Sequence, residues 1–123
     1  MTGPTPETYP APPDLEARWA ALQARLADTL GSAPPTTEAL LLLIGLQRMG
    51  LAPEKLSKTQ KQDLIQLGSF TVLAHGGYYR ETYTDDEGWP HFELKRPLPF
   101  LDIFSQAVFV KHRLVEYFEA IFA

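Results

Sequence analysis

A long apolar helix at the C-terminal end places the strongest constraint on how this chain folds. Residues 99–122 follow a helical period, and Pro99 suits the first turn, where an N–H has no partner in the helix. At 100° per residue, the apolar side chains between Phe100 and Phe122 occupy an arc of about 180°, wider than the roughly 100° stripe of an ordinary surface helix. So broad a face needs more than one neighbour. We therefore expect this helix to pack on its own chain and also on a second copy, as a homodimer.

Two residues interrupt the pattern of this helix. Lys111 falls near the middle of the apolar arc, and Phe109 falls near the middle of the polar one. A lysine in an apolar face extends its amine to water, pairs with a carboxylate, or loses its proton. A carboxylate partner would come from the same chain or from across a dimer interface, and no companion acid–base set marks Lys111 as catalytic. Phe109 is either a single harmless exposure or a contact point on the surface.

Proline and helix-capping residues organise the start of the chain. Residues 1–13 contain five prolines and almost no apolar side chains, which predicts a disordered Pro-rich tail. Residues 14–123 are of a length typical of one domain, and we predict a single helical domain there. Its first helix is expected from about Asp14, as the N-cap, to Leu30, with Gly31 as the stop.

Two more helices are predicted before residue 78. The segment from about Thr37 to Met49 is apolar all round, which is typical of a central helix. Gly50 followed by Leu51 predicts a Schellman motif at its end. Gly45 costs about 1 kcal/mol there relative to alanine, so we expect it to allow close contact with another helix. A capping box at Ser57 and Gln60 begins the third helix, and residues 76–77, both glycine, end it.

The segment between the third and fourth helices has the alternation of a β-hairpin. Residues 78–84 and 89–95 form the predicted strands, and residues 85–88 form the turn. Pro90 cannot donate to a neighbouring strand, which restricts the hairpin to a sheet edge. On this pattern, one face of the first strand carries Tyr79, Glu81 and Tyr83, and one face of the second carries Phe92 and Leu94. The predicted fold class is mostly α: four helices with a small hairpin inserted between the third and fourth.

The hairpin aromatics, with two residues of the last helix, make up the candidate interaction surface. Its members are Tyr79, Tyr83, Trp89, His91, Phe92, Phe109 and Lys111. The favoured function is a non-enzymatic protein-interaction or assembly module, self-associating through the last helix. If the aromatics instead pack inward, the hairpin caps the helical core. The alternative function is a small-ligand-binding protein or enzyme with a pocket under the 78–95 hairpin, near Tyr78, Tyr79, Trp89 and His91. In such a pocket His91 is the natural acid–base group.

Composition excludes several classes of site and partner. The chain has no cysteine, so disulfides and thiolate chemistry are excluded, and its three histidines lie in separate segments without metal-ligand spacing. We therefore predict no catalytic residues, no metal and no cofactor. A net charge of −4 makes nucleic acid an unfavoured partner. The longest apolar run, residues 39–46, is far shorter than the roughly 20 residues of a membrane span, and residues 1–10 lack a signal-peptide pattern, which predicts a cytoplasmic protein.

From about Thr36 onward, the chain resembles a group of small bacterial proteins of the Bacteroidetes type. The resemblance rests on the segments ALLLLIGLQRMG and LSKTQKQDL, and above all on GGYY followed by DDEGWPH. It implies a bacterial, cytoplasmic setting, and it brings no known activity.

Overall fold

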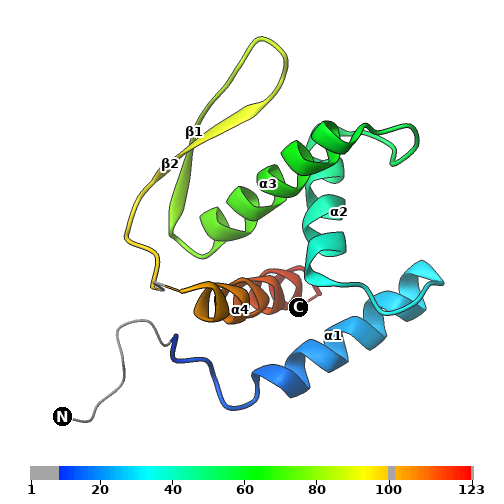
Figure 1. The fold of residues 1–123 in the computed structure, drawn as a ribbon, viewed down its shortest axis with the longest axis vertical. Helices are drawn as coiled ribbons and strands as arrows, with labels where there is room; N and C mark the ends of the chain where they lie inside the picture. Colours follow the sequence, from blue (N-terminus) through cyan, green and yellow to red (C-terminus); the bar gives the residue numbers. More distant parts are fainter. Residues whose placement is uncertain (1–8, 100–101, 123) are drawn as a thin grey trace. The chain divides into compact units, whose positions relative to one another are not determined.

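The structure is a computed structural model that describes residues 9–99 and 102–122. These residues form four helices and one two-stranded antiparallel hairpin, coloured along the sequence in Figure 1. In chain order the elements are α1 (Leu15–Leu30), α2 (Thr37–Met49), α3 (Lys58–His75), β1 (Tyr79–Thr84), β2 (Pro90–Leu94) and α4 (Ile103–Phe122). The prediction of a mostly α fold, with a hairpin between the third and fourth helices, is confirmed.

The chain forms two compact units, which we describe separately. The first unit contains α1 and α4, and the second, residues 36–96, contains α2, α3 and the hairpin. Compactness alone does not decide whether two units unfold together, so the single domain over residues 14–123 stays a prediction. The predicted disordered tail stays a prediction too. Its residues 1–8 lie outside the described residues, whereas Tyr9 is placed against α4.

Two glycines allow α2 and α3 to approach each other closely. A Cβ atom at Gly45 would lie 2.1 Å from the carbonyl oxygen of Leu64, and one at Gly68 would lie 2.0 Å from that of Leu41. Real Cβ atoms do not approach this closely, so each glycine admits the backbone of the other helix. The prediction of close contact at Gly45 is confirmed. The reciprocal contact at Gly68 was not predicted.

The ends of α2 and α3 follow the predicted local rules. Gly50 adopts the left-handed conformation with φ of 67°, and the N–H of Leu51 donates to the Leu46 carbonyl at 3.0 Å, as in a Schellman motif. At the start of α3, the Ser57 hydroxyl accepts from the Gln60 N–H, and the Gln60 side chain accepts from the Ser57 N–H. These caps fix where α2 ends and where α3 begins.

A bulge in β1 changes which side chains share a face of the hairpin. Glu81 pairs with Phe92 and Tyr83 pairs with His91, so Thr82 has no partner residue in β2. The extra residue turns Tyr83 to the opposite face from Tyr79, because side chains alternate along a strand. The prediction that Tyr79, Glu81 and Tyr83 share one face is therefore wrong for Tyr83. A bulge leaves no clear trace in an alternating sequence.

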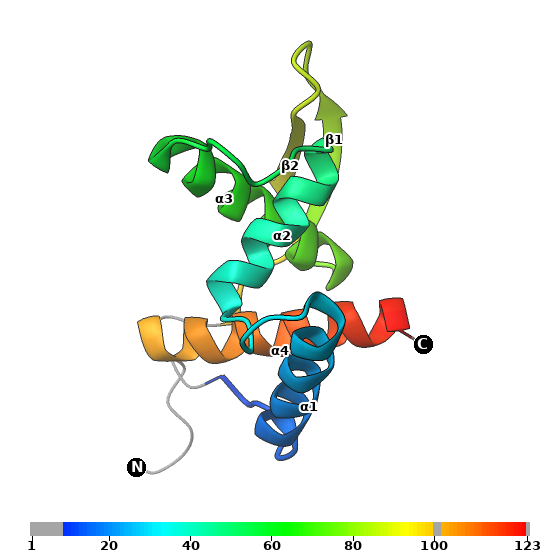
Figure 2. The ribbon, with the colours of Figure 1, turned by 90° about the vertical axis from the view of Figure 1, so that its right-hand side faces the viewer.

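The first unit differs from the predictions at its helix starts. α4 begins at Ile103, and Pro99 lies in a bend before it. The Asp102 carboxylate accepts a 2.8 Å hydrogen bond from the Ser105 N–H, which is how an N-cap side chain acts. At α1, Asp14 holds the N-cap position, but its side chain makes no capping bond. Gly31 ends α1 as predicted, with φ of 65°. Figure 2 shows α1 and α4 from a second direction.

Candidate functional site

Two of the hairpin aromatics pack inward on α3. The ring of Phe70 on α3 meets Tyr79 edge-on at 4.9 Å between centroids, and it stacks on Phe92 at 5.4 Å. Arg48 on α2 pairs with Glu81 on the same hairpin face at 2.9 Å. These contacts fix the hairpin on the two helices of its own unit, and they leave Tyr79 and Phe92 only partly accessible.

The opposite face of the hairpin carries a stacked pair of rings. Tyr83 is 59% exposed, and its ring stacks on His91 at 4.5 Å with planes 3° apart. Nε2 of His91 lies 2.9 Å from Oδ2 of Asp85, and Oδ1 of Asp85 accepts from the N–H groups of Glu87 and Trp89. The bond to His91 is the largest cause that lowers the pKa of Asp85, followed by the N–H of Trp89. Asp85 thus closes the turn with one carboxylate oxygen and orients the His91 ring with the other.

A cavity of about 240 Å³ lies between the hairpin and the middle of α3. The hairpin contributes Trp89 and His91 to its wall, and α3 contributes the polar side chains of Asp63 and Gln66. Neither Tyr78 nor Tyr79 lines this cavity. Its position corresponds to the predicted pocket under the hairpin, although two of the four residues expected near it lie elsewhere.

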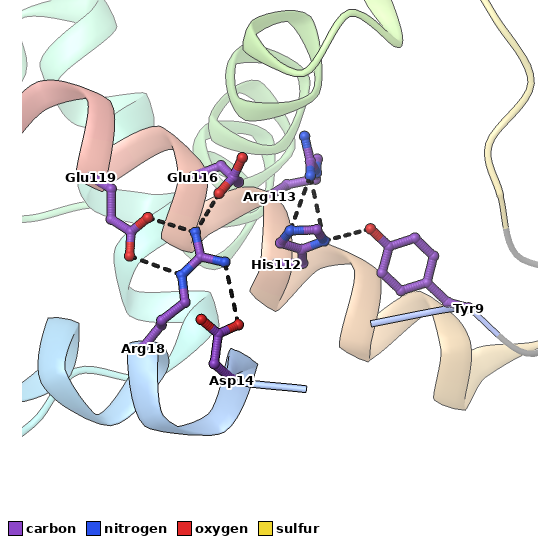
Figure 3. A network of polar contacts seen from close by, with 7 residues as sticks. All are labelled: Tyr9, Asp14, Arg18, His112, Arg113, Glu116 and Glu119. Atoms are coloured by element: carbon purple, nitrogen blue, oxygen red, sulfur yellow. Dashed lines mark hydrogen bonds and ion pairs between the residues drawn. The ribbon is translucent and has the colours of Figure 1, made fainter. Parts of the chain in front are cut away.

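A network of charged side chains joins α1 to α4, as Figure 3 shows. Arg18 on α1 donates to Glu116 and Glu119 on α4 and also lies 3.8 Å from Asp14. The hydrogen bond from Arg18 lowers the pKa of Glu119, and the two glutamates raise the pKa of Arg18. The guanidinium is shared by three carboxylates, so it neutralises charge between the helices and is not available to bind an anion.

His112 belongs to a second group of polar contacts on α4. The hydroxyl of Tyr9 is 2.5 Å from Nδ1 of His112, and the Tyr9 N–H donates to Ser105 at 3.1 Å. Burial is the main cause that lowers the pKa of His112, and the neighbouring Arg113 lowers it further. A neutral imidazole can accept a hydrogen bond from the tyrosine hydroxyl. The pair therefore attaches the segment before α1 to α4 (Figure 3).

Phe109 is buried next to this attachment. Its exposure is 0%, and the ring of Tyr9 contacts it edge-on at 5.2 Å. The sequence predicted either a harmless exposure of Phe109 or a contact point on the surface. Both predictions assumed that the ring is accessible to solvent, and this assumption is wrong. The physical reason is that residues before α1 cover the polar side of α4, and their composition gave no sign of this.

Lys111 pairs within the chain. Its Nζ lies 3.2 Å from Oε2 of Glu16 on α1, and 5.7 Å from the centre of the Trp19 ring. In the single chain, the carboxylate partner of Lys111 is therefore Glu16. The alternative of a partner across a dimer interface stays a prediction. An exposed pair of this kind contributes little to stability, about 1 kcal/mol at most.

The structure therefore divides the predicted interaction surface into separate places. Tyr79 and Phe92 pack on Phe70 of α3, and Tyr83 stacks on His91 on the opposite face. Both Trp89 and His91 line the cavity. Phe109 and Lys111 belong to the other compact unit. Sequence reasoning did not name Asp63, Gln66, Arg18 or Tyr9. Spacings of three between Asp63 and Gln66, and between Glu116 and Glu119, were the available signals for shared helix faces.

Other classes of site have no counterpart in the described part of the chain. Within residues 9–99 and 102–122, no three histidine, aspartate or glutamate side chains converge as metal ligands do. None of the helices described is long and apolar enough to cross a bilayer. Comparison with protein-family models, curated proteins and solved structures finds no match to this chain. The resemblance to the bacterial group, with the setting it implies, stays a prediction.

Proposed function

We propose that this protein is a non-enzymatic assembly module that self-associates through α4. The observation that carries the proposal is an apolar stripe along that helix. Its residues recur at spacings of four, three, four, three and four, which is the repeat of a helix that packs along another helix. The stripe consists of Ile103, Ala107, Val110, Leu114, Tyr117 and Ile121.

Both ends of this stripe are open to solvent in the single chain. Ile103 is 73% exposed and Ile121 is 56% exposed, whereas Leu114 at the centre is buried. Beside the stripe, Phe104 is 81% exposed. α1 contacts α4 through residues outside the stripe, including Lys111 and Phe122. Large apolar side chains this exposed at both ends of one helix support a contact with another molecule.

A second copy of the chain is the partner that best fits the order of residues in the stripe. In an antiparallel pair about a two-fold axis, Ile103 faces Ile121 of the other copy. Leu114 is buried within its own chain and does not contribute to this contact. The small Ala107 faces the large Tyr117, so the two sides interdigitate. The stripe is self-complementary in this direction, which supports a homodimer.

Cysteine cross-linking tests this arrangement directly, since the chain has no cysteine of its own. Residues 103 and 121 are about 27 Å apart along one helix, far beyond the reach of a disulfide within a chain. We expect a mixture of the Ile103→Cys and Ile121→Cys proteins to form a covalent dimer on mild oxidation. Each variant alone is expected to stay monomeric on a non-reducing gel.

The control replaces one cysteine with a position outside the stripe. Ala24→Cys on the exposed side of α1 reports random collisions when it is mixed with Ile103→Cys. Cross-linking of the control mixture as fast as the test mixture would contradict the pairing. Self-cross-linking of Ile103→Cys alone would contradict the antiparallel direction.

A further inference from the structure

We propose that the cavity between the hairpin and α3 binds a small organic ammonium group. The proposal is independent of pairing through α4, because every residue lining the cavity belongs to the unit formed by residues 36–96. The two walls are held at a fixed spacing by the stack of Phe70 on Phe92. The site is therefore built from elements that pack on each other.

The charge in the cavity favours a cation. Asp63 is the one carboxylate among its described lining residues, and no lysine or arginine lines it. Within the described residues, the Asp63 carboxylate has neither an ion-pair nor a hydrogen-bond partner. Asp85 at the edge of the hairpin already accepts three hydrogen bonds. Asp63 is exposed to solvent, so its charge is accessible to a cation that enters from outside.

The apolar part of the wall favours a cation with carbon attached to the nitrogen. Trp89, Phe70 and Phe92 contribute aromatic rings to the same cavity. Aromatic faces attract cations, and alkylated ammonium groups are the cations that clusters of aromatic rings recognise best. Aromatic rings that line the same cavity as a carboxylate are the combination that separates an organic ammonium ion from a hydrated metal ion, which prefers oxygen ligands.

Size and hydrogen bonding narrow the ligand further. The cavity of about 240 Å³ is below the roughly 300–1,000 Å³ of sites for drug-sized molecules. It suits a trimethylammonium head or a short alkylamine. The Gln66 amide offers a donor and an acceptor for a polar group beside the nitrogen. The ammonium group belongs either to a free amine or to the lysine side chain of a peptide. The cavity would recognise the same chemical group in both cases.

Binding can be followed by NMR through the indole N–H of Trp89. The chain has two tryptophans, so a Trp19→Phe protein assigns the signal. We expect choline to shift the Trp89 signal in a saturable way. Its uncharged carbon analogue, 3,3-dimethylbutanol, should bind at least about fivefold more weakly, because it lacks the charge that contacts Asp63. Titration with n-butylamine and with N-acetyl-lysine methylamide shows whether a free amine or a peptide side chain binds more tightly.

Charge and ring variants separate this assignment from simple apolar binding. Asp63→Asn is expected to weaken choline binding about fivefold. Trp89→Leu is expected to weaken it by a similar factor, followed through the side-chain amide signal of Gln66 because this variant lacks the indole. Asp86→Asn, which removes a charge from the turn outside the cavity wall, is the matched control and is expected to bind as the unchanged protein does. Circular dichroism checks that each variant is folded. No saturable shift with any of the three ammonium probes, or equal binding of choline and 3,3-dimethylbutanol, would overturn the proposal.

Discussion

Gly45 and Gly68 show how single residues set the distance between two helices. Each glycine faces the carbonyl oxygen of the other helix, Leu64 and Leu41 respectively, at a distance that excludes any side chain. The sequence predicted the contact at Gly45, because a glycine inside an apolar helix costs stability unless something approaches it. Gly68 lies in a more polar stretch, and its role needed the structure.

Gly68→Ala should lower the free energy of unfolding by about 2 kcal/mol. An added Cβ meets backbone that cannot rotate away, and the cost of overpacking, about 1–3 kcal/mol, exceeds the gain of about 1 kcal/mol in helix propensity. Urea denaturation measures the change. Gln62→Ala, at an exposed position of the same helix, is the control and is expected to change stability by less than about 0.5 kcal/mol. A Gly68→Ala protein as stable as the parent would contradict the close approach.

The carboxyl group of Asp85 makes a prediction about pH. Its pKa in the folded hairpin lies below the ordinary aspartate value, so the ionised group stabilises the hairpin at neutral pH. That contribution is lost below about pH 4, as the pH falls through the lowered pKa. We expect His91→Phe to move the carboxyl titration of Asp85, followed by NMR, to higher pH, because the bond to His91 is the largest cause of the shift.

A ring variant controls for stacking in this titration. Tyr83→Leu removes the stack on His91 and keeps the bond between His91 and Asp85, so the midpoint for Asp85 should stay low. If the Asp85 carboxyl group has the same titration midpoint in His91→Phe as in the parent protein, the contact with His91 does not lower the pKa of Asp85 in solution.

The helices and strands were predictable to different degrees, for physical reasons. α2 ends and α3 begins at residues whose capping chemistry is local, so these two bounds could be read from Gly50 and Ser57. α4 was predicted to begin at Pro99, because proline is common in a first turn, but the cap is Asp102. The bulge at Thr82 depends on pairing across the hairpin, which no local pattern in β1 records.

Removing the cap of α4 should destabilise the protein by about 1 kcal/mol. In Asp102→Ala the N–H of Ser105 loses its acceptor, and the first turn of α4 loses a favourable negative charge. Thermal unfolding together with amide hydrogen exchange of residues 103–106 measures the effect. Asp102→Asn, which keeps an acceptor oxygen, should retain most of the stability. Loss of equal size in both variants would contradict a capping role.

The candidate sites could be foreseen only in part, since they depend on which segments meet. The aromatic hairpin pointed to a pocket, and two of the residues expected there, Trp89 and His91, do line the cavity. Asp63 and Gln66 come from the polar start of α3, and a sequence does not show which polar side chains a hairpin will cover. Tyr9 was assigned to a disordered tail, because prolines around it indicate a lack of regular structure, yet it contacts α4.

The two tryptophans allow a test of the predicted single domain over residues 14–123. Trp19 lies in the unit with α1 and α4, and Trp89 lies in the unit with the hairpin. Trp19→Phe and Trp89→Phe proteins each keep one fluorophore. A single domain predicts that fluorescence and circular dichroism give one urea midpoint within each protein. In either protein, a fluorescence midpoint clearly different from that of circular dichroism would mean that the units unfold separately.

Self-association through α4 is most directly tested by sedimentation velocity at tens of micromolar. The account predicts a species of twice the 13.8 kDa chain mass for the unchanged protein. It predicts a folded monomer for Ile103→Asp, whose charge would lie opposite Ile121 of the other copy. The matched variant Gln106→Asp, on the polar side of the same helix, should remain dimeric. A parent protein that sediments as a monomer across this range would contradict the account.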